Sequence, residues 1–229
     1  VYKRQVADST LHASISNQVE FFAVQNPIPQ YSYISSTSVS GDSVLITYLG
    51  DNSVGVSEVY LYRSFDNGIN FTRIDSEINP VFPITFHVLD AMPNERSSMY
   101  QVSVLDACGN QIAYSNVGKT ILLSVDNNDY ALKSLNWNSY IRWEVGVENY
   151  EVRVRQQNMN SFQNVANLDS SFNSYAHEIN NFITPPFEGE VCYKIQALEV
   201  LNSFGEQGIS ESNEVCIQQQ LMVSIPNAL

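Results

Sequence analysis

Long hydrophobic runs and basic residues are both scarce in this sequence. No apolar stretch approaches the roughly 20 residues that a membrane-spanning helix needs, so we expect no membrane insertion. Lysine and arginine number 11 against 24 aspartates and glutamates, which gives a formal net charge of −13. A chain this acidic lacks the basic face that nucleic acids and anionic membrane surfaces require. We therefore expect no nucleic-acid partner.

Recognisable catalytic patterns are also missing. The histidines are His12, His87 and His177, and none belongs to a zinc-protease, nucleophile-elbow or Cys–His motif. His177 is adjacent to Glu178, but neighbouring residues of a strand point to opposite faces of a sheet. The 10 glycines are scattered and form no phosphate-binding loop. The sequence predicts a protein that is not an enzyme and has no cofactor.

Short runs rich in Val, Ile, Tyr, Phe and Ser fill most of the chain. Asn, Asp and Gly separate these runs, and the hydrophobic fraction of 44% is enough for real cores. Branched and aromatic residues between such breaks favour strands over helices. We therefore predict an all-β fold.

One pattern recurs three times at intervals of roughly one hundred residues, which is the length of a whole small domain. The pattern is a tyrosine followed six residues later by an acidic residue, in YKRQVAD, YQVSVLD and YKIQALE. A Ser-Asn pair follows each copy, and these pairs are Ser16-Asn17, Ser115-Asn116 and Ser212-Asn213. An apolar strand then follows each pair. We read the chain as tandem copies of one unit.

Within each unit, short strands about 8–12 residues apart indicate a β-sandwich. We predict two domains of seven strands each, at 28–122 and 123–220. Residues 1–27 are predicted to be the terminal hairpin of a preceding sandwich plus a linker, and 221–229 the start of a sorting domain or a linker. The predicted strands are 31–39, 43–49, 56–64, 70–76, 84–90, 98–106 and 113–122, then 123–126, 130–137, 148–157, 162–168, 173–179, 189–199 and 209–219. With no initiating Met or signal peptide, the chain is expected to be a mature or excised fragment.

The ordered aromatic residues of these units resemble those of fibronectin type III domains, which are immunoglobulin-like β-sandwiches. Trp137 matches the core tryptophan of that family, and Tyr100 and Tyr193 match its corner tyrosine. In the first domain Tyr48 stands where the tryptophan is expected, which implies a differently packed core. The resemblance implies that these four residues are structural.

A narrower resemblance covers CYKIQALE, GISESNEVC and the final IPNAL. These stretches are similar to the ends of large surface proteins of gliding bacteria, where fibronectin-like repeats precede a sorting domain read by the type IX secretion system. Leu229 departs from the usual opening of that sorting domain. The resemblance implies an extracellular, cell-surface location and a role in adhesion, gliding motility or spacing, with neighbouring sandwiches of the same chain as partners. It names no ligand.

The three cysteines are Cys108, Cys192 and Cys216. If Glu199 and Ile209 flank the last turn, the antiparallel register places Cys192 opposite Cys216 on the outer face of the sheet. We predict a disulfide, with two reduced thiols or a metal site as the alternatives. Cys108 follows a strand and is open to three interpretations, which are a free thiol, a partner in another chain, or a buried unpaired residue.

The loop SVDNNDY offers oxygen atoms that calcium prefers, and Asp126 and Asp129 are its candidate ligands. A solvated turn explains the same residues. A calcium site and a solvated turn are therefore both open interpretations of this loop. The segment KTILLSVDN joins the two domains without a Gly/Ser linker, which predicts an extended, fairly rigid rod.

Three functions agree with these observations. The first is a non-enzymatic spacer in a secreted surface protein. The second is a set of accessory modules attached to a secreted hydrolase, whose catalytic domain would lie before Val1. The third is a fibre subunit, in which the hairpin of residues 1–22 completes a sandwich of the next subunit and builds filaments.

Overall fold

The computed structural model describes residues 5–7, 13–15, 20, 27–183 and 188–219. This part of the chain consists of β-strands, connecting loops and a short 3-10 turn, η1, at Ile179–Asn181. Within it, no helix is long and apolar enough to cross a membrane. His12, the Ser16-Asn17 pair and the predicted segment 221–229 lie outside the described residues.

Near the N-terminus, two short strands form an antiparallel pair. Strand β1 (Gln5–Ala7) pairs with β2 (Ala13–Ile15), and Gln5 lies opposite Ile15. This pair falls inside the predicted hairpin of residues 1–22. Its assignment to a preceding sandwich stays a prediction.

Two antiparallel sheets form the first sandwich. One sheet has the order β3-β4-β7, and the other has the order β10-β8-β5-β6 with β9 also paired to β8. The hydrophobic core between them takes residues from both sheets, such as Ile34 and Ile46 from one and Leu61 and Val102 from the other. The strands are β3 (Ser32–Ser40), β4 (Ser43–Gly50), β5 (Val56–Ser64), β6 (Thr72–Ile78), β7 (Ile84–Val88), β8 (Met99–Asp106), β9 (Gln111–Tyr114) and β10 (Gly118–Lys119).

The second sandwich repeats this plan. Its sheets have the orders β11-β12-β15 and β14-β13-β16-β17, with β18 also paired to β16. Strand for strand this is the order of the first sandwich, which confirms the predicted fold class of tandem immunoglobulin-like, fibronectin type III-like β-sandwiches. The strands are β11 (Leu123–Asp126), β12 (Leu132–Trp137), β13 (Val147–Gln156), β14 (Gln163–Asp169), β15 (Ser174–Glu178), β16 (Gly189–Glu199), β17 (Ile209–Glu211) and β18 (Val215–Gln219). The exact division at residues 28, 123 and 221 stays a prediction.

Alternation of side chains explains why these segments are strands. Every second residue of β4 is buried, from Val44 to Gly50, because successive side chains of a strand point to opposite faces. The aromatic residues singled out in the sequence lie in the two cores. Tyr48 packs edge-on against Phe82 at 5.4 Å, and Trp137 packs edge-on against Tyr150 at 5.7 Å, both between ring centroids. Tyr100 and Tyr193 are fully buried.

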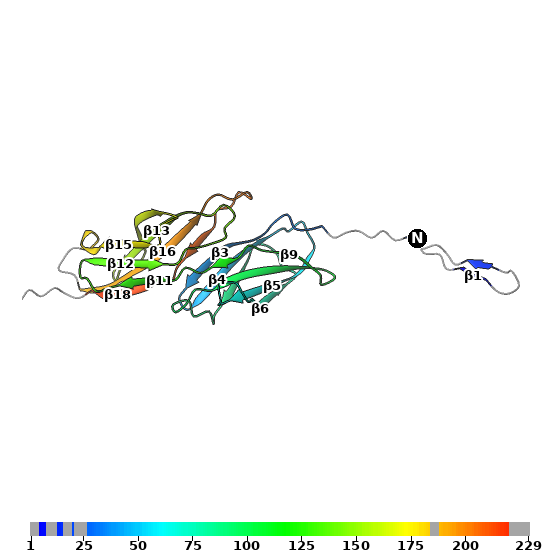
Figure 1. Ribbon diagram of the computed structural model, residues 1–229, viewed down its shortest axis with the longest axis horizontal. Helices are drawn as coiled ribbons and strands as arrows, with labels where there is room; N and C mark the ends of the chain where they lie inside the picture. The colour runs from blue at the N-terminus through cyan, green and yellow to red at the C-terminus, as the bar shows by residue number, and fades with distance from the viewer. Residues whose placement is uncertain (1–4, 8–12, 16–19, 21–26, 184–187, 220–229) are drawn as a thin grey trace, which may run out of the picture.

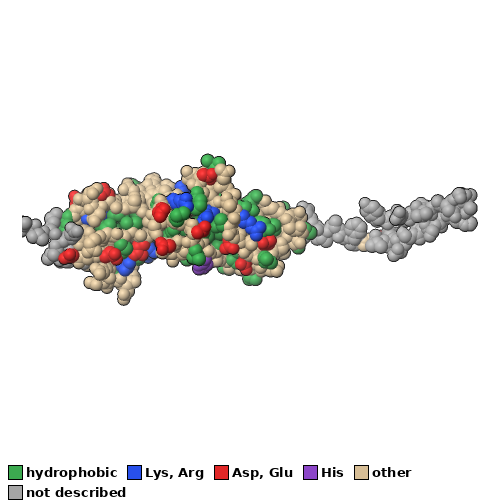
Figure 2. Space-filling view, turned by 90° about the horizontal axis from the view of Figure 1, so that it is seen from below, with side chains coloured by type: hydrophobic (Ala, Val, Ile, Leu, Met, Phe, Trp, Pro, Cys, Tyr) green, Lys and Arg blue, Asp and Glu red, His purple; other side chains and the backbone are tan. Residues whose placement is uncertain are grey.

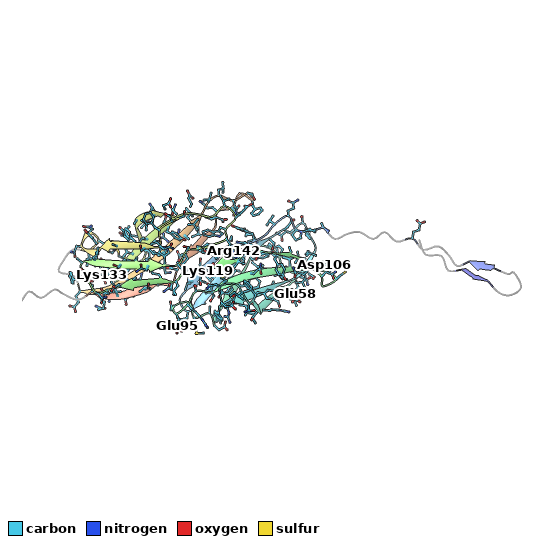
Figure 3. All side chains as sticks on the ribbon, viewed as in Figure 1. Glu58, Glu95, Asp106, Lys119, Lys133 and Arg142 are labelled. Atoms are coloured by element: carbon cyan, nitrogen blue, oxygen red, sulfur yellow. A yellow bond between two sulfur atoms is a disulfide. The ribbon has the colours of Figure 1, made fainter. Side chains whose placement is uncertain are left out.

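The two sandwiches follow one another along the long axis of the molecule (Figure 1). Lys119 and Arg142 mark the region where they meet, and Lys133 lies toward the far end of the second sandwich (Figure 3). In the face shown in Figure 2, basic and acidic side chains are interspersed and no broad basic area forms.

Candidate functional site

A one-residue bulge interrupts the last strand of each sandwich at the Ser-Asn pair. Partners on β8 advance three residues, from Ser103 to Tyr100, while the opposing chain advances four, from Tyr114 to Gly118. The second sandwich has the same count between β16 and its partners β17 and β18. The single predicted strands 113–122 and 209–219 are therefore wrong, because each is two strands separated by this bulge.

Each Ser-Asn pair bonds the bulge to both sheets. The hydroxyl of Ser212 accepts a hydrogen bond from the Ile195 backbone N–H at 2.9 Å, which holds the bulge against β16. The amide of Asn213 accepts from the Leu123 N–H at 2.6 Å and donates to the Leu123 carbonyl at 3.1 Å, across to the other sheet. Asn213 thus satisfies both backbone groups of a buried residue.

The first sandwich makes the same set of bonds. Ser115 accepts from Val102, and Asn116 pairs with both backbone groups of Ile34. The Ser-Asn pair is evident in the sequence only as a recurring landmark. In each sandwich it forms hydrogen bonds that connect the two sheets.

Because of this bulge, the predicted register at the last turn is wrong by one residue. Leu198, not Glu199, lies opposite Ile209. Cys192 nevertheless lies opposite Cys216, because the extra residue at the bulge shifts the pairing by one. The disulfide between them is present, and neither cysteine belongs to the hydrophobic core that contains Val191. Cys108 is free and exposed.

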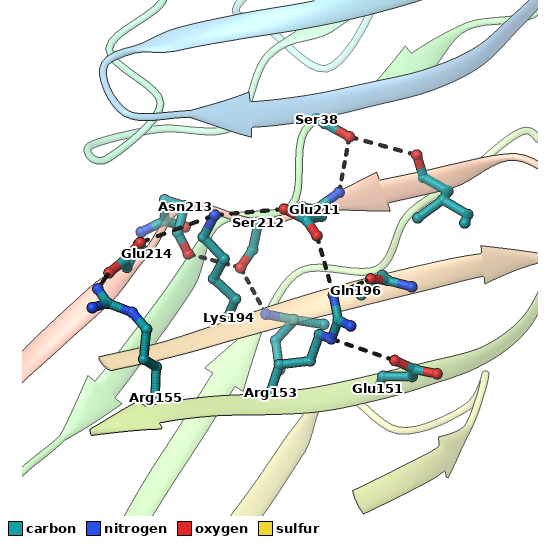
Figure 4. Close-up of polar contacts among 12 residues, drawn as sticks. Ser38, Glu151, Arg153, Arg155, Lys194, Gln196, Glu211, Ser212, Asn213 and Glu214 are labelled. Carbon is teal, nitrogen blue, oxygen red and sulfur yellow. Dashed lines mark hydrogen bonds and ion pairs between the residues drawn. The ribbon is translucent and has the colours of Figure 1, made fainter. Parts of the chain in front are cut away.

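The joint between the two sandwiches combines polar and aromatic contacts. Strand β3 of the first sandwich bulges between Ile34 and Ser36, and this irregular stretch faces the second sandwich. Thr37 donates its backbone N–H to the Ser210 hydroxyl at 3.0 Å. Ser38 accepts from the Glu211 N–H at 3.1 Å, as Figure 4 shows. Strand β17 therefore runs beside β3.

A buried tyrosine crosses the joint. Tyr33 comes from β3, is 4% exposed, and belongs to the hydrophobic core of the second sandwich. Its hydroxyl donates to the carboxylate of Glu199, which is completely buried, and accepts from the Glu144 N–H at 3.1 Å. Glu199 also accepts from the Gly208 N–H at 2.8 Å. Burial and the Glu199 hydrogen bond raise the pKa of Tyr33, so its phenol stays protonated.

Close backbone contact at Gly208 completes the joint. A Cβ atom added there would lie 2.2 Å from the Ser35 carbonyl oxygen and 3.0 Å from Trp143 Nε1. Trp143 donates to that same Ser35 oxygen at 3.1 Å. Its ring packs against that of Tyr140 at 4.0 Å with a tilt of 36°, and the Tyr140 hydroxyl bonds to Thr37. Only glycine leaves room for this approach.

The connecting segment is fastened from the second sandwich. Asn138 accepts from the Leu122 N–H at 2.7 Å and donates to the Thr120 carbonyl at 3.0 Å. Asn116 also donates to the Arg142 carbonyl at 3.1 Å. The connector between the sandwiches therefore has fixed hydrogen-bond partners along its length, which restricts rotation.

Charged side chains of opposite sign line the outer face next to the joint (Figure 4). Arg153 lies 3.3 Å from Glu211, and Lys194 lies 3.5 Å from the other oxygen of the same carboxylate. Arg155 lies 2.6 Å from Glu214. These pairs are partly exposed, and each contributes little to stability.

In the candidate calcium loop, oxygen atoms bind the ammonium group of Lys133. Lys133 is 1% exposed, and its ammonium donates to Asn127 Oδ1 at 2.6 Å and to the Asp129 carbonyl. The carboxylate of Asp129 accepts from the Ala131 and Leu132 N–H groups, and that of Asp126 accepts from the Asn128 N–H. The structure does not bring Asp126 and Asp129 into one group of ligands, and calcium there stays a prediction.

The histidines that the structure describes lie in different settings. His177 is buried and bonds through Nδ1 to the Tyr193 hydroxyl at 3.0 Å, while Glu178 beside it is exposed, as strand alternation predicts. Burial lowers the pKa of His177, so its ring is neutral at pH 7. His87 is exposed. In the described ranges, the one group of possible metal ligands is Glu190, Cys192 and Cys216, and two of its members form the disulfide.

No protein-family model matches the chain, and no curated protein matches it. Among solved structures, the chicken CNTN1 FN1-FN3 domains are similar, with 14% sequence identity and a TM-score of 0.32. The match covers 85% of this chain and 65% of that one. The assignment of the fold rests on the strand order of the two sandwiches.

Proposed function

We propose that this chain is a non-enzymatic spacer segment that holds successive β-sandwiches of a longer extracellular protein in a fixed end-to-end arrangement. The observation that carries the proposal is the joint, where Tyr33 of one sandwich is buried in the core of the next and bonds to the buried Glu199. Flexible tandem domains have small, polar contacts between them. A joint with a shared core instead favours one relative orientation.

One further feature supports an extracellular location. The Cys192–Cys216 disulfide suits an oxidising compartment, since cytosolic thiols are kept reduced. The net charge of −13 favours solubility and opposes self-association. We extend the proposal to a bacterial surface protein with a role in adhesion or gliding motility, exported by type IX secretion. Support for that extension comes from the sequence resemblance of CYKIQALE, GISESNEVC and IPNAL.

The spacer role is tested by measuring distances between spin labels. One label is placed on the free, exposed Cys108 and the other on a cysteine replacing the exposed Ser170 of the second sandwich. A rigid joint gives one narrow distance distribution, and Gly208→Val broadens it. A control pair within the first sandwich, Cys108 with Glu95→Cys, stays narrow in both backgrounds. A distribution that is already broad without the Gly208 substitution excludes the spacer role.

The export route needs a test in cells. An epitope inserted at Ser170, in the exposed turn after β14, is detected by antibody on intact cells. Surface labelling that disappears in a strain without type IX secretion supports this route. Labelling that persists in that strain rules it out and leaves the spacer role unaffected.

A further inference from the structure

A cleft of about 370 Å³ opens beside the joint, with one wall from each sandwich. The first sandwich contributes Tyr31, Gly50, Phe82 and Pro83, and the loop before β17 contributes Phe204 and Glu206. This volume lies in the range of small-molecule and side-chain binding pockets, which often form between domains.

Aromatic residues of both sandwiches line the cleft. Phe204 lies 5.2 Å from Tyr31 and 5.5 Å from Tyr33 between ring centroids, and is 39% exposed. On the other side, Asn52 holds Phe82 through two 3.0 Å hydrogen bonds to its backbone. A Cβ at Gly50 would lie 2.6 Å from the Phe82 ring, so glycine is what allows the ring to lie there. The rings are therefore positioned before any ligand binds.

The charge around the cleft is negative. Glu206 lines it, and no hydrogen bond or ion pair joins its carboxylate to another described residue. Glu144 and Glu148 bond to the same loop, at Ser203 and Gln207. No lysine or arginine lines the cleft.

Elsewhere in the chain, aromatic rings already have cationic partners. Arg73 lies 3.5 Å above the ring of Tyr60, and Arg96 lies 3.7 Å above that of Phe65. Among the described residues, no cation lies above the rings of Tyr31, Phe82 or Phe204. The cleft offers the same kind of ring without its partner.

We propose that the cleft between the sandwiches binds an arginine side chain of a partner protein. A guanidinium is planar, so it stacks on aromatic rings while forming paired hydrogen bonds with a carboxylate. Phe204 and Tyr31 supply the rings, and Glu206 supplies the carboxylate. This binding goes beyond the spacer role and does not depend on it.

The test uses Nα-acetyl-arginine amide and the citrulline compound, which has nearly the same shape and no charge. Both are titrated into the ¹⁵N-labelled chain up to about 50 mM, because a single side chain binds in the millimolar range. The amide signals of Gly50 and Gly205 shift and saturate with arginine, and the shift weakens as salt rises. Equal shifts with citrulline, or none with either compound, overturn the proposal.

Two variants test whether Phe204 and Glu206 bind the arginine side chain. Phe204→Ala weakens arginine binding at least tenfold, whereas Phe172→Ala, at a 51% exposed phenylalanine of the same sandwich, leaves it unchanged. Glu206→Gln keeps the shape of the loop and weakens binding several-fold. Unchanged affinity in Glu206→Gln contradicts the proposal even if Phe204→Ala does not fold. Saturating shifts with methyl glucoside but not with arginine reassign the cleft to a carbohydrate. A negative result in this titration does not affect the spin-label test of the spacer role.

Discussion

Replacing Gly208 by alanine is the most direct perturbation of the joint. The new Cβ would lie 2.2 Å from the Ser35 carbonyl oxygen, which is a backbone atom of the other sandwich. An ordinary contact needs a further separation of roughly 1 Å, since packed atoms do not interpenetrate. The two sandwiches must therefore move apart, and Glu199 and Trp143, which would lie 2.8 and 3.0 Å from the new Cβ, must shift as well.

The cost of this movement can be worked from the bonds next to Gly208. The Trp143–Ser35 and Thr37–Ser210 bonds are worth about 1 kcal/mol each, and the Tyr33 bond to the Glu199 carboxylate about 2 kcal/mol. Their joint loss removes about 4 kcal/mol of coupling between the sandwiches. We expect a coupling of this size to make the two sandwiches unfold together, although separate domains commonly unfold in separate steps.

Denaturant unfolding followed by two probes measures this coupling. Both tryptophans, Trp137 and Trp143, lie in the second sandwich, so fluorescence reports that sandwich and circular dichroism reports both. The two curves coincide in the unmodified chain and separate in Gly208→Ala. Gly55→Ala is the matched control, because a Cβ at Gly55 meets nothing within 4 Å. Coinciding curves with unchanged midpoints in Gly208→Ala would refute the reasoning.

Three further predictions concern the second sandwich. Asn213→Ala leaves both backbone groups of the buried Leu123 unpaired. It is expected to lower the free energy of unfolding by about 2–4 kcal/mol in denaturant titrations, and a loss under about 0.5 kcal/mol would contradict the bridging role of Asn213. Replacing Cys192 and Cys216 together by serine lowers the free energy of unfolding by about 3 kcal/mol, since the disulfide closes a loop with a sequence separation of 24. An unchanged midpoint of denaturant unfolding would show that the disulfide does not stabilise the sandwich. The buried His177 has a lowered pKa, so below its ordinary value of 6.5 the unfolded chain binds a proton that the folded chain does not. Stability therefore falls as pH drops from about 7 to 5, and His177→Gln flattens this dependence in thermal melts; an unaltered slope would show that other groups cause it.

Much of the fold could be predicted from local patterns. Side-chain alternation located the strands, and the recurring tyrosine and Ser-Asn landmarks revealed the repeated unit. Cys192 and Cys216 were placed opposite each other correctly, although the assumed turn was one residue out of register. The bulge that corrects it leaves no sign in the alternation, because Ser212 and Asn213 are both buried polar residues.

The candidate site depended on contacts that no local pattern contains. The Tyr33–Glu199 bond joins residues 166 positions apart, and the Gly208–Ser35 approach likewise joins two sandwiches. One contact is local, because the ammonium of Lys133 bonds to Asn127 Oδ1 and to the Asp129 carbonyl, only six and four residues earlier in the chain. The sequence alone determined the strands and their repetition, because strand periodicity is a property of adjacent residues. Only the tertiary structure decided how the sandwiches join, because that depends on which distant surfaces pack against each other.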